Sequence, residues 1–235
     1  MSERQLLFHN LISSIWFLLG STTWTVSFFL TLRKDLIVEI VTYVAFSFLL
    51  MHGLLEICID LCHTRTAIHG RYNNSSCYNI FHSLVFVLGV LAEAASFYLS
   101  LQNWGSPMYL WIYLASAHLF FLTAIFTLYG RWCCIPGAGL DNISNTMFTL
   151  GTIFMLVSAY ETFFLVQGDD KFFAQWLGVF LWDVAATLST GRDFLKFRRN
   201  PSRGTRRRQL IRDDDDEYES SVNYSSYEDD TDVER

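Results

Sequence analysis

Charged side chains are scarce over most of this chain. Its 235 residues include 17 Lys and Arg and 23 Asp and Glu, a charged share of 17%, against roughly 25% in soluble domains. Residues 192–235 carry 22 of these charges, so residues 1–191 carry only 18. A water-soluble surface cannot be built over that length from so few charges, which excludes an ordinary globular enzyme.

Proline is also rare, and the long apolar runs contain none. A helix needs about 20 apolar residues to cross a bilayer. Six stretches reach that length, and they cover 11–32, 36–59, 80–101, 108–129, 145–166 and 172–190. Because every proline lies outside them, we expect no proline kink. The sequence therefore predicts an all-α, polytopic integral membrane protein with six transmembrane helices in residues 1–191.

The motifs of several known chemistries are missing. The sequence has no His-Glu-x-x-His, no Cys-x-x-Cys and no Gly-x-Ser-x-Gly, the patterns of zinc proteases, thiol or metal sites and serine hydrolases. No predicted span contains a lysine, which excludes a retinal Schiff base, and no pair of histidines is placed to ligate haem. We therefore predict no cofactor and no metal, and an enzyme is the least favoured class.

Positive charge is concentrated after the last predicted span, and this sets the predicted topology. Positions 192–212 hold nine Arg and Lys residues. The positive-inside rule places this C-terminal segment in the cytoplasm, and six spans then place the N-terminus there too. Arg33 and Lys34, in a short turn on the opposite side, argue weakly against this orientation. The N-terminus lacks the features of a cleaved signal peptide, so we expect the first span to be an anchor.

All five cysteines fall on the predicted cytoplasmic side; they are Cys58, Cys62, Cys77, Cys133 and Cys134. A reducing compartment would keep them as thiols. Two interpretations remain open. The thiols are buried or interfacial side chains without a role of their own, or Cys133 and Cys134, just past the end of a span, are sites of S-palmitoylation.

The C-terminal tail divides into a basic segment, 192–212, and an acidic segment, 213–235. Neither can bury a core, so we predict a disordered tail. Arginines expected to contact an anionic inner leaflet are Arg198, Arg199, Arg206, Arg207 and Arg208. Candidate phosphorylation sites, each three residues before an acid, are Ser225, Ser226 and Thr231. Such a tail suits a cytoplasmic protein partner, whereas its acidic half and its membrane tether disfavour nucleic acid.

The first and third predicted spans open with similar sequences. Residues 10–20 (NLISSIWFLLG) and 79–89 (NIFHSLVFVLG) coincide at five of eleven positions, and residues 148–151 (FTLG) repeat the end of the pattern in the fifth span. A Gly-Arg pair follows each even-numbered span, at intervals of 60 and 61 residues. These similarities predict three tandem, parallel helix hairpins. Phe, Leu and Ser are common in any span, so part of the agreement arises by chance.

Each copy of the pattern also has a serine seven residues after its glycine. Seven residues are about two helical turns, so both small residues lie on one face of the helix. Small residues allow close helix packing in lipid. The predicted packing residues are Gly20, Ser27, Gly89, Ser96, Gly151 and Ser158.

Three ionisable residues, Glu93, His118 and Asp183, lie near the middle of their predicted spans. Insertion of a charged side chain at that depth costs about 2.5–3.5 kcal/mol, which makes such residues functional candidates. No Lys or Arg lies inside a span to pair with the acids. Two interpretations are open: neutral acids that join helices by hydrogen bonds, or a proton or cation site shared by the three residues.

Two functional hypotheses follow. The first is a small transporter or channel that uses Glu93, His118 and Asp183 as a proton or cation site. The alternative is a non-catalytic membrane scaffold or accessory subunit that acts through its cytoplasmic tail. The sequence indicates no substrate, no organelle and no oligomeric state.

Overall fold

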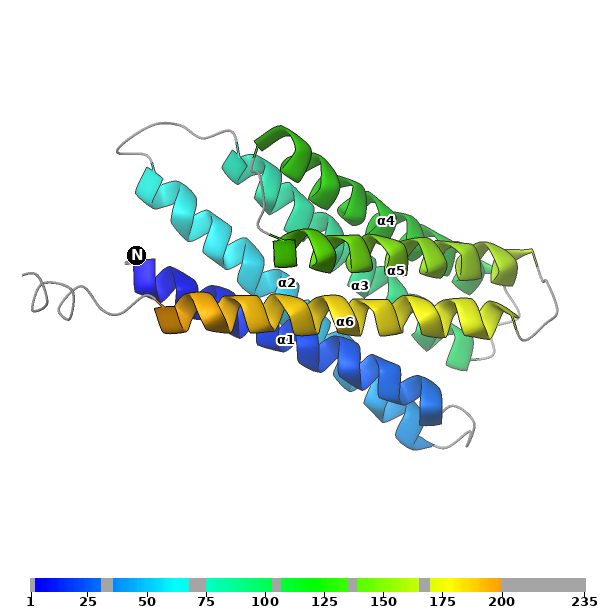
Figure 1. The fold of residues 1–235 in the computed structure, drawn as a ribbon. Coiled ribbons are helices and arrows are strands. Elements are labelled where there is room, and N and C mark those ends of the chain that lie inside the picture. Colours follow the sequence, from blue (N-terminus) through cyan, green and yellow to red (C-terminus); the bar gives the residue numbers. More distant parts are fainter. Residues whose placement is uncertain are drawn as a thin grey trace, which may run out of the picture. The chain divides into compact units, whose positions relative to one another are not determined.

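The structure is a computed structural model that describes residues 3–30, 36–67, 75–102, 107–134, 139–164 and 170–199. These residues form six α-helices and confirm the predicted all-helical fold (Figure 1). The helices are α1 (Glu3–Leu30), α2 (Leu36–Ala67), α3 (Ser75–Leu101), α4 (Met108–Cys134), α5 (Gly139–Phe163) and α6 (Asp170–Arg199).

Five of these helices are long and apolar enough to cross a membrane. Their apolar segments are Arg4–Leu30, Leu36–Cys62, Tyr78–Leu101, Met108–Leu128 and Asn142–Phe163. A helix suits this environment because all its backbone groups are bonded within the segment, where lipid offers no partner. The chain is therefore a multi-pass helical membrane protein. Which side of the membrane its ends face stays a prediction.

The sixth helix, α6, is not among these five segments. It contains Asp183, Arg192 and Asp193, and these side chains lower its mean hydropathy. Its middle is nevertheless buried inside the protein, since Val179, Trp182 and Ala186 are each 0% exposed. The predicted sixth span at 172–190 stays a prediction.

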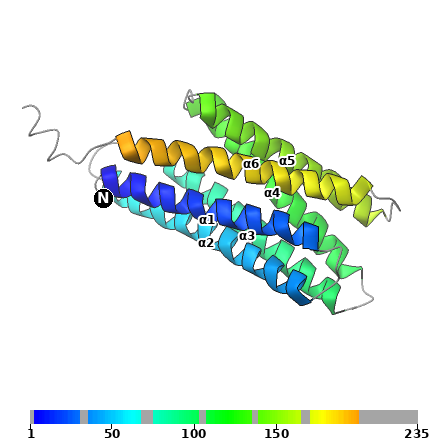
Figure 2. The ribbon, with the colours of Figure 1, turned by 60° about the horizontal axis from the view of Figure 1, so that its bottom comes forward.

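Within residues 1–197, each helix packs against the next one along the chain. Contacts join α1 to α2, α2 to α3, α3 to α4 and α4 to α5, and Gly151 of α5 lies against Gly178 of α6. The last helix returns to the first, because the rings of Trp24 and Trp182 are 5.9 Å apart. Figures 1 and 2 both show α6 between α1 and α5. The six helices thus surround a common centre.

Aromatic side chains from five helices fill this centre. We call Phe17, Phe86, Phe120, Phe148 and Trp182 the aromatic core. Trp182 and Phe120 are fully buried, with ring centroids 4.8 Å apart. Phe148 stacks on Trp182 at 5.1 Å, and Phe17 and Phe86 each lie 6.3 Å from it. Aromatic pairs at such distances contribute about 0.5–1.5 kcal/mol each beyond the area that they bury.

The predicted packing glycines lie where two helices approach closely. A Cβ atom on Gly20 would come within 2.7 Å of Leu49 in α2, and one on Gly89 within 2.9 Å of Phe120 in α4. On Gly151 it would lie 2.5 Å from Trp182. Real Cβ atoms do not approach so closely, so a larger residue would push the helices apart. The predicted serines, Ser27, Ser96 and Ser158, are also buried.

Several predictions fall outside the residues or side chains that the structure describes. Helix α4 includes Cys133 and Cys134, but their side chains are not described. Arg198 and Arg199, at the end of α6, are exposed. The remaining tail lies outside the described residues, and with it Arg206, Arg207, Arg208, Ser225, Ser226 and Thr231.

Candidate functional site

Glu93, the first of the three predicted mid-membrane residues, joins α3 to α4. Its side chain is 5% exposed, and its Oε2 atom accepts a hydrogen bond from Ser116 Oγ at 2.7 Å. Ser116 Oγ also lies 3.2 Å from the carbonyl oxygen of Gly89. The buried carboxyl therefore has a hydroxyl partner on the neighbouring helix.

His118 joins α4 to α5 on the outside of the helical unit, by which we mean the six packed helices α1 to α6. Its side chain is exposed, and its Nδ1 lies 2.7 Å from the carbonyl oxygen of Leu114. Because a carbonyl oxygen only accepts, Nδ1 carries the hydrogen. In the neutral ring, Nε2 then accepts a hydrogen bond from the Tyr160 hydroxyl at 3.0 Å.

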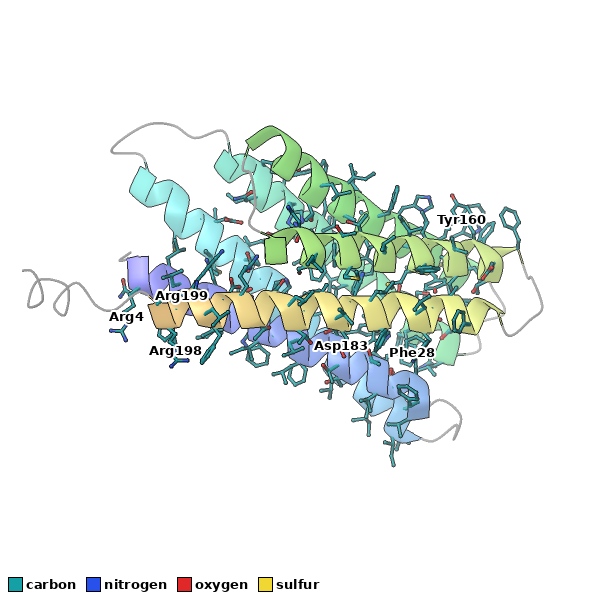
Figure 3. The ribbon with its side chains drawn as sticks, viewed as in Figure 1. Arg4, Phe28, Tyr160, Asp183, Arg198 and Arg199 are labelled. Atoms are coloured by element: carbon teal, nitrogen blue, oxygen red, sulfur yellow. The ribbon has the colours of Figure 1, made fainter. Side chains whose placement is uncertain are left out.

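Asp183 joins α6 to α1. Its Oδ1 atom accepts hydrogen bonds from Thr22 Oγ1 at 2.5 Å and from Ser21 Oγ at 3.2 Å. Figure 3 shows Asp183 and Tyr160 on opposite sides of α6 in that view. The described hydrogen bonds of Glu93, His118 and Asp183 thus belong to three different helix pairs. A site shared by the three residues stays a prediction.

The structure places a different set of polar residues around one cavity. The cavity has a volume of about 890 Å³ and is lined by residues of all six helices. It lies at the end of the helical unit where α1 begins and α6 ends, with Leu6 and Arg192 among its lining residues. None of Glu93, His118 and Asp183 lines it.

The cavity is deep as well as polar. Its lining on α1 runs from Leu6 to Phe17, and on α2 from His52 to Asp60. Eight residues of helix, from His52 to Asp60, rise roughly 12 Å. Three phenylalanines of the aromatic core, Phe17, Phe86 and Phe148, also line the cavity. These three rings pack against Phe120 and Trp182, which do not line the cavity, and we call the three the cavity floor.

An ion pair forms one wall of the cavity. Arg192 binds the neighbouring carboxylate of Asp193 through two bonds, from Nε to Oδ1 at 2.7 Å and from Nη2 to Oδ2 at 3.0 Å. Ser14 Oγ of α1 donates to the same Oδ2 atom at 2.5 Å, and Thr190 donates to the Ser14 carbonyl oxygen at 3.0 Å. These bonds fasten the end of α6 to α1.

His52 and Glu56 of α2 also line the cavity, and Ser13 of α1 joins them through a chain of hydrogen bonds. Ser13 Oγ lies 2.8 Å from His52 Nδ1 and donates to Glu56 Oε1 at 2.5 Å. His52 Nδ1 also lies 3.1 Å from the Ser13 carbonyl oxygen, so it carries the hydrogen. Ser13 Oγ accordingly accepts a hydrogen bond from His52 and donates one to Glu56. The His52 ring stacks on Phe17, with centroids 4.9 Å apart.

Two further hydrogen bonds join neighbouring helices at the cavity. His82 Nε2 of α3 lies 2.8 Å from Thr127 Oγ1 of α4. Thr127 donates to the Thr123 carbonyl oxygen, so it accepts from His82. Between α5 and α6, Ser144 and Ser189 are joined by their hydroxyl oxygens at 2.8 Å.

The formal charge of the cavity lining is negative. Glu56, Asp60 and Asp193 contribute three carboxylates and Arg192 one guanidinium, which leaves a formal charge of −2 when the histidines are neutral. The Arg192–Asp193 pair cancels internally, so the net charge lies with Glu56 and Asp60, one helical turn apart on α2. Among the described residues no group of three or more His, Cys, Asp or Glu side chains is arranged to hold a metal ion.

Sequence reasoning did not select this set, although the sequence holds a signal for it. His52, Glu56 and Asp60 are spaced by four residues, which places all three on one face of a helix. Depth in the membrane was the criterion that selected Glu93 and Asp183 instead. Comparison of the chain with protein-family models, with curated protein sequences and with solved structures gives no match.

Proposed function

We propose that this chain is a membrane transport protein that takes a small organic cation into the polar cavity between its helices. The observation that carries the proposal is the composition of the cavity lining, which combines the carboxyls of Glu56 and Asp60 with a floor of three phenylalanines. A soluble protein would expose such a site on a loop or cleft. Here it lies inside a ring of apolar helices, where polar groups are costly and mark pathways for ions or substrates.

The chemistry of the lining favours an ammonium group. A cation about 4 Å from a carboxylate gains roughly 4 kcal/mol at an effective dielectric constant of 20. The faces of phenylalanine rings attract the same charge and suit its alkyl substituents. The cavity volume of about 890 Å³ lies within the range of small-molecule sites and far exceeds the need of a bare inorganic ion.

The aromatic floor supports a transporter in preference to an open channel. Phe17, Phe86 and Phe148 line the cavity, and Trp182 and Phe120 pack behind them at 0% exposure. A cation bound in the cavity cannot continue through this packed layer. Passage across the membrane therefore needs a second arrangement of the helices, as in alternating access. The predicted cytoplasmic position of both termini assigns the cavity to the cytoplasmic side of the membrane.

The proposal includes the three tandem hairpins, α1–α2, α3–α4 and α5–α6. Their predicted glycines occupy equivalent contacts, with Leu49, Phe120 and Trp182 as the facing residues. The three phenylalanines of the cavity floor each precede one of these glycines by three residues. Repeated units are a common way to build a transporter with a central site.

Uptake of radiolabelled tetramethylammonium into proteoliposomes tests this function. The full-length protein is reconstituted, and uptake is measured against the probe concentration, with acetate as an anionic comparison. We expect saturable uptake of tetramethylammonium and none of acetate. Asp60→Asn removes one cavity charge without a change of shape, and it should lower uptake at least about tenfold.

The matched control is Glu39→Gln. Glu39 also lies on α2 but does not line the cavity, so this variant should transport like the unmodified protein. Far-ultraviolet circular dichroism confirms that both variants are helical. Absence of saturable uptake in the unmodified protein, or equal losses in Asp60→Asn and Glu39→Gln, would contradict the proposed function.

A further inference from the structure

Three interhelical hydrogen bonds at the cavity occupy equivalent positions. They join Ser13 to Glu56, His82 to Thr127 and Ser144 to Ser189. In each pair the first residue lies seven positions before the packing glycine of its helix. The second lies seven positions after the residue that faces this glycine, which is Leu49, Phe120 or Trp182.

The second and third pairs show what packing alone requires at this position. Thr127 and Ser189 complete their hydrogen bonds with an uncharged hydroxyl group. Glu56 makes the corresponding bond with a carboxyl group. Glu56 thus differs from its two counterparts in carrying a carboxyl group, which the equivalent helix contacts of the other hairpins do not require.

The first hairpin also differs from the other two at a second position of the cavity lining, which is His52. His52 lies three residues after Leu49, where the other two hairpins have Thr123 and Ala185 after Phe120 and Trp182. All three positions line the cavity. The first hairpin alone thus places a titratable pair at these two positions, and Ser13, which is 0% exposed, connects the pair.

We propose that Ser13, His52 and Glu56 form a proton-binding relay that competes with the organic cation, so that the protein exchanges the cation for a proton. This inference rests on the proposed function and adds its coupling. A cation beside the Glu56 carboxylate and a proton on that carboxylate exclude each other, because the neutral acid no longer attracts the cation.

The hydrogen bonds define the path of the proton. A proton binds His52 at Nε2 and makes the ring cationic. The Nδ1 hydrogen then moves to Ser13 Oγ, 2.8 Å away, while the Ser13 hydrogen moves to Glu56 Oε1 over 2.5 Å. The end products are a neutral histidine with its hydrogen on Nε2, an unchanged serine and a neutral glutamic acid. One proton enters, and no charge is left on the ring.

The other charged and titratable groups around the cavity come from three helices. Asp60 lies on α2, His82 on α3, and Arg192 with Asp193 on α6. The linings of α1, α4 and α5 contain only apolar, hydroxyl and amide side chains. Asp193 is held by Arg192 and Ser14, and His82 is bonded to Thr127. Asp60 adds to the negative potential but has no place in the relay.

Isothermal titration of the full-length protein with tetramethylammonium chloride over a range of pH tests the coupling. The dissociation constant should rise about tenfold per unit of falling pH on the acid side, as one proton competes with one cation. Titration in buffers of different ionisation enthalpy should show the release of about one proton per bound cation near the midpoint. A dissociation constant independent of pH in the unmodified protein would overturn the relay.

Glu56→Thr removes the carboxyl and gives the first hairpin the residue that the second hairpin has at this position. It should bind the probe at least about tenfold more weakly, with a weaker dependence on pH and a smaller proton release, because the Asp60 carboxyl alone remains beside the cation. Asp60→Asn should also bind more weakly but retain the pH dependence, because the relay is intact. A Glu56→Thr protein that keeps the full pH dependence and proton release of the unmodified protein overturns the relay and leaves the proposed function standing. Absence of binding at every pH in the unmodified protein refutes both.

Discussion

Ionisable side chains occur in two regions of the helical unit, at the end that contains the cavity and in the middle. Their surroundings differ between the two regions. In the middle, Glu93 and Asp183 each accept hydrogen bonds from hydroxyls of one neighbouring helix. At the cavity, Glu56, Asp60 and Asp193 come from two helices and line one space. Isolated acids join helices, whereas gathered acids create a negative potential that a ligand can use.

The aromatic core lies between these two regions. Removal of one of its rings should lower the free energy of unfolding more than any other substitution considered. Trp182→Ala removes a fully buried ring that contacts Phe148 at 5.1 Å and Phe120 at 4.8 Å. We expect a loss of about 3–5 kcal/mol in the free energy of unfolding. Denaturant unfolding in detergent, followed by circular dichroism, measures it. Trp111→Ala is the control, since Trp111 is 59% exposed; an equal loss there would contradict the account.

The close helix contact beside this core gives the next largest effect. Gly151→Ala places a Cβ atom 2.5 Å from Trp182 and 2.6 Å from the Gly178 carbonyl oxygen. Overpacking of this kind costs about 1–3 kcal/mol, visible as a lower midpoint of unfolding. Gly191→Ala meets nothing within 4 Å and should be neutral or gain up to about 1 kcal/mol from helix propensity. The opposite ranking of the two variants would refute the close contact.

The smallest expected effect lies at the cavity wall. Ser14→Ala removes the hydrogen bond to Asp193 Oδ2 and leaves the bonds from Arg192 in place. A hydrogen bond to a charged group contributes about 1.5–3 kcal/mol, and the remaining pair limits the loss to the lower end. Ser100→Ala is the control, because its exposed hydroxyl donates within its own helix to Phe97. Equal stability of the two variants would show that the α1–α6 bond is weak.

Much of the fold could be predicted from the sequence. Apolar runs without proline define helices, and five of them are confirmed as long enough to span a membrane. Helix α1 extends beyond the predicted span, since it begins at Glu3, eight residues before residue 11. Phe8 explains part of this extension, because its ring contacts Phe197 of α6 at 6.0 Å. A contact 189 residues away in the chain is not visible in a hydropathy pattern.

The candidate site was harder to predict, because depth and direction are separate properties. Position along a span gives the depth of Glu93 or Asp183, and the sequence alone provides it. The face that a residue presents to its neighbours depends on how the helices are rotated, which packing decides. The glycines carried part of this information. Gly20, Gly89 and Gly151 mark the sides of α1, α3 and α5 that approach another helix, and the cavity phenylalanines lie close to them.

Uptake of tetramethylammonium by two matched variants tests the central claim most directly. Glu56→Gln and Glu93→Gln each replace one carboxyl with an amide of the same shape, one in the cavity and one at a helix contact outside it. The account predicts that Glu56→Gln loses saturable uptake, while Glu93→Gln keeps it within about twofold, because Ser116 can still bond the amide oxygen. Full uptake in Glu56→Gln together with its loss in Glu93→Gln would contradict the account and place the transport site in the middle of the membrane.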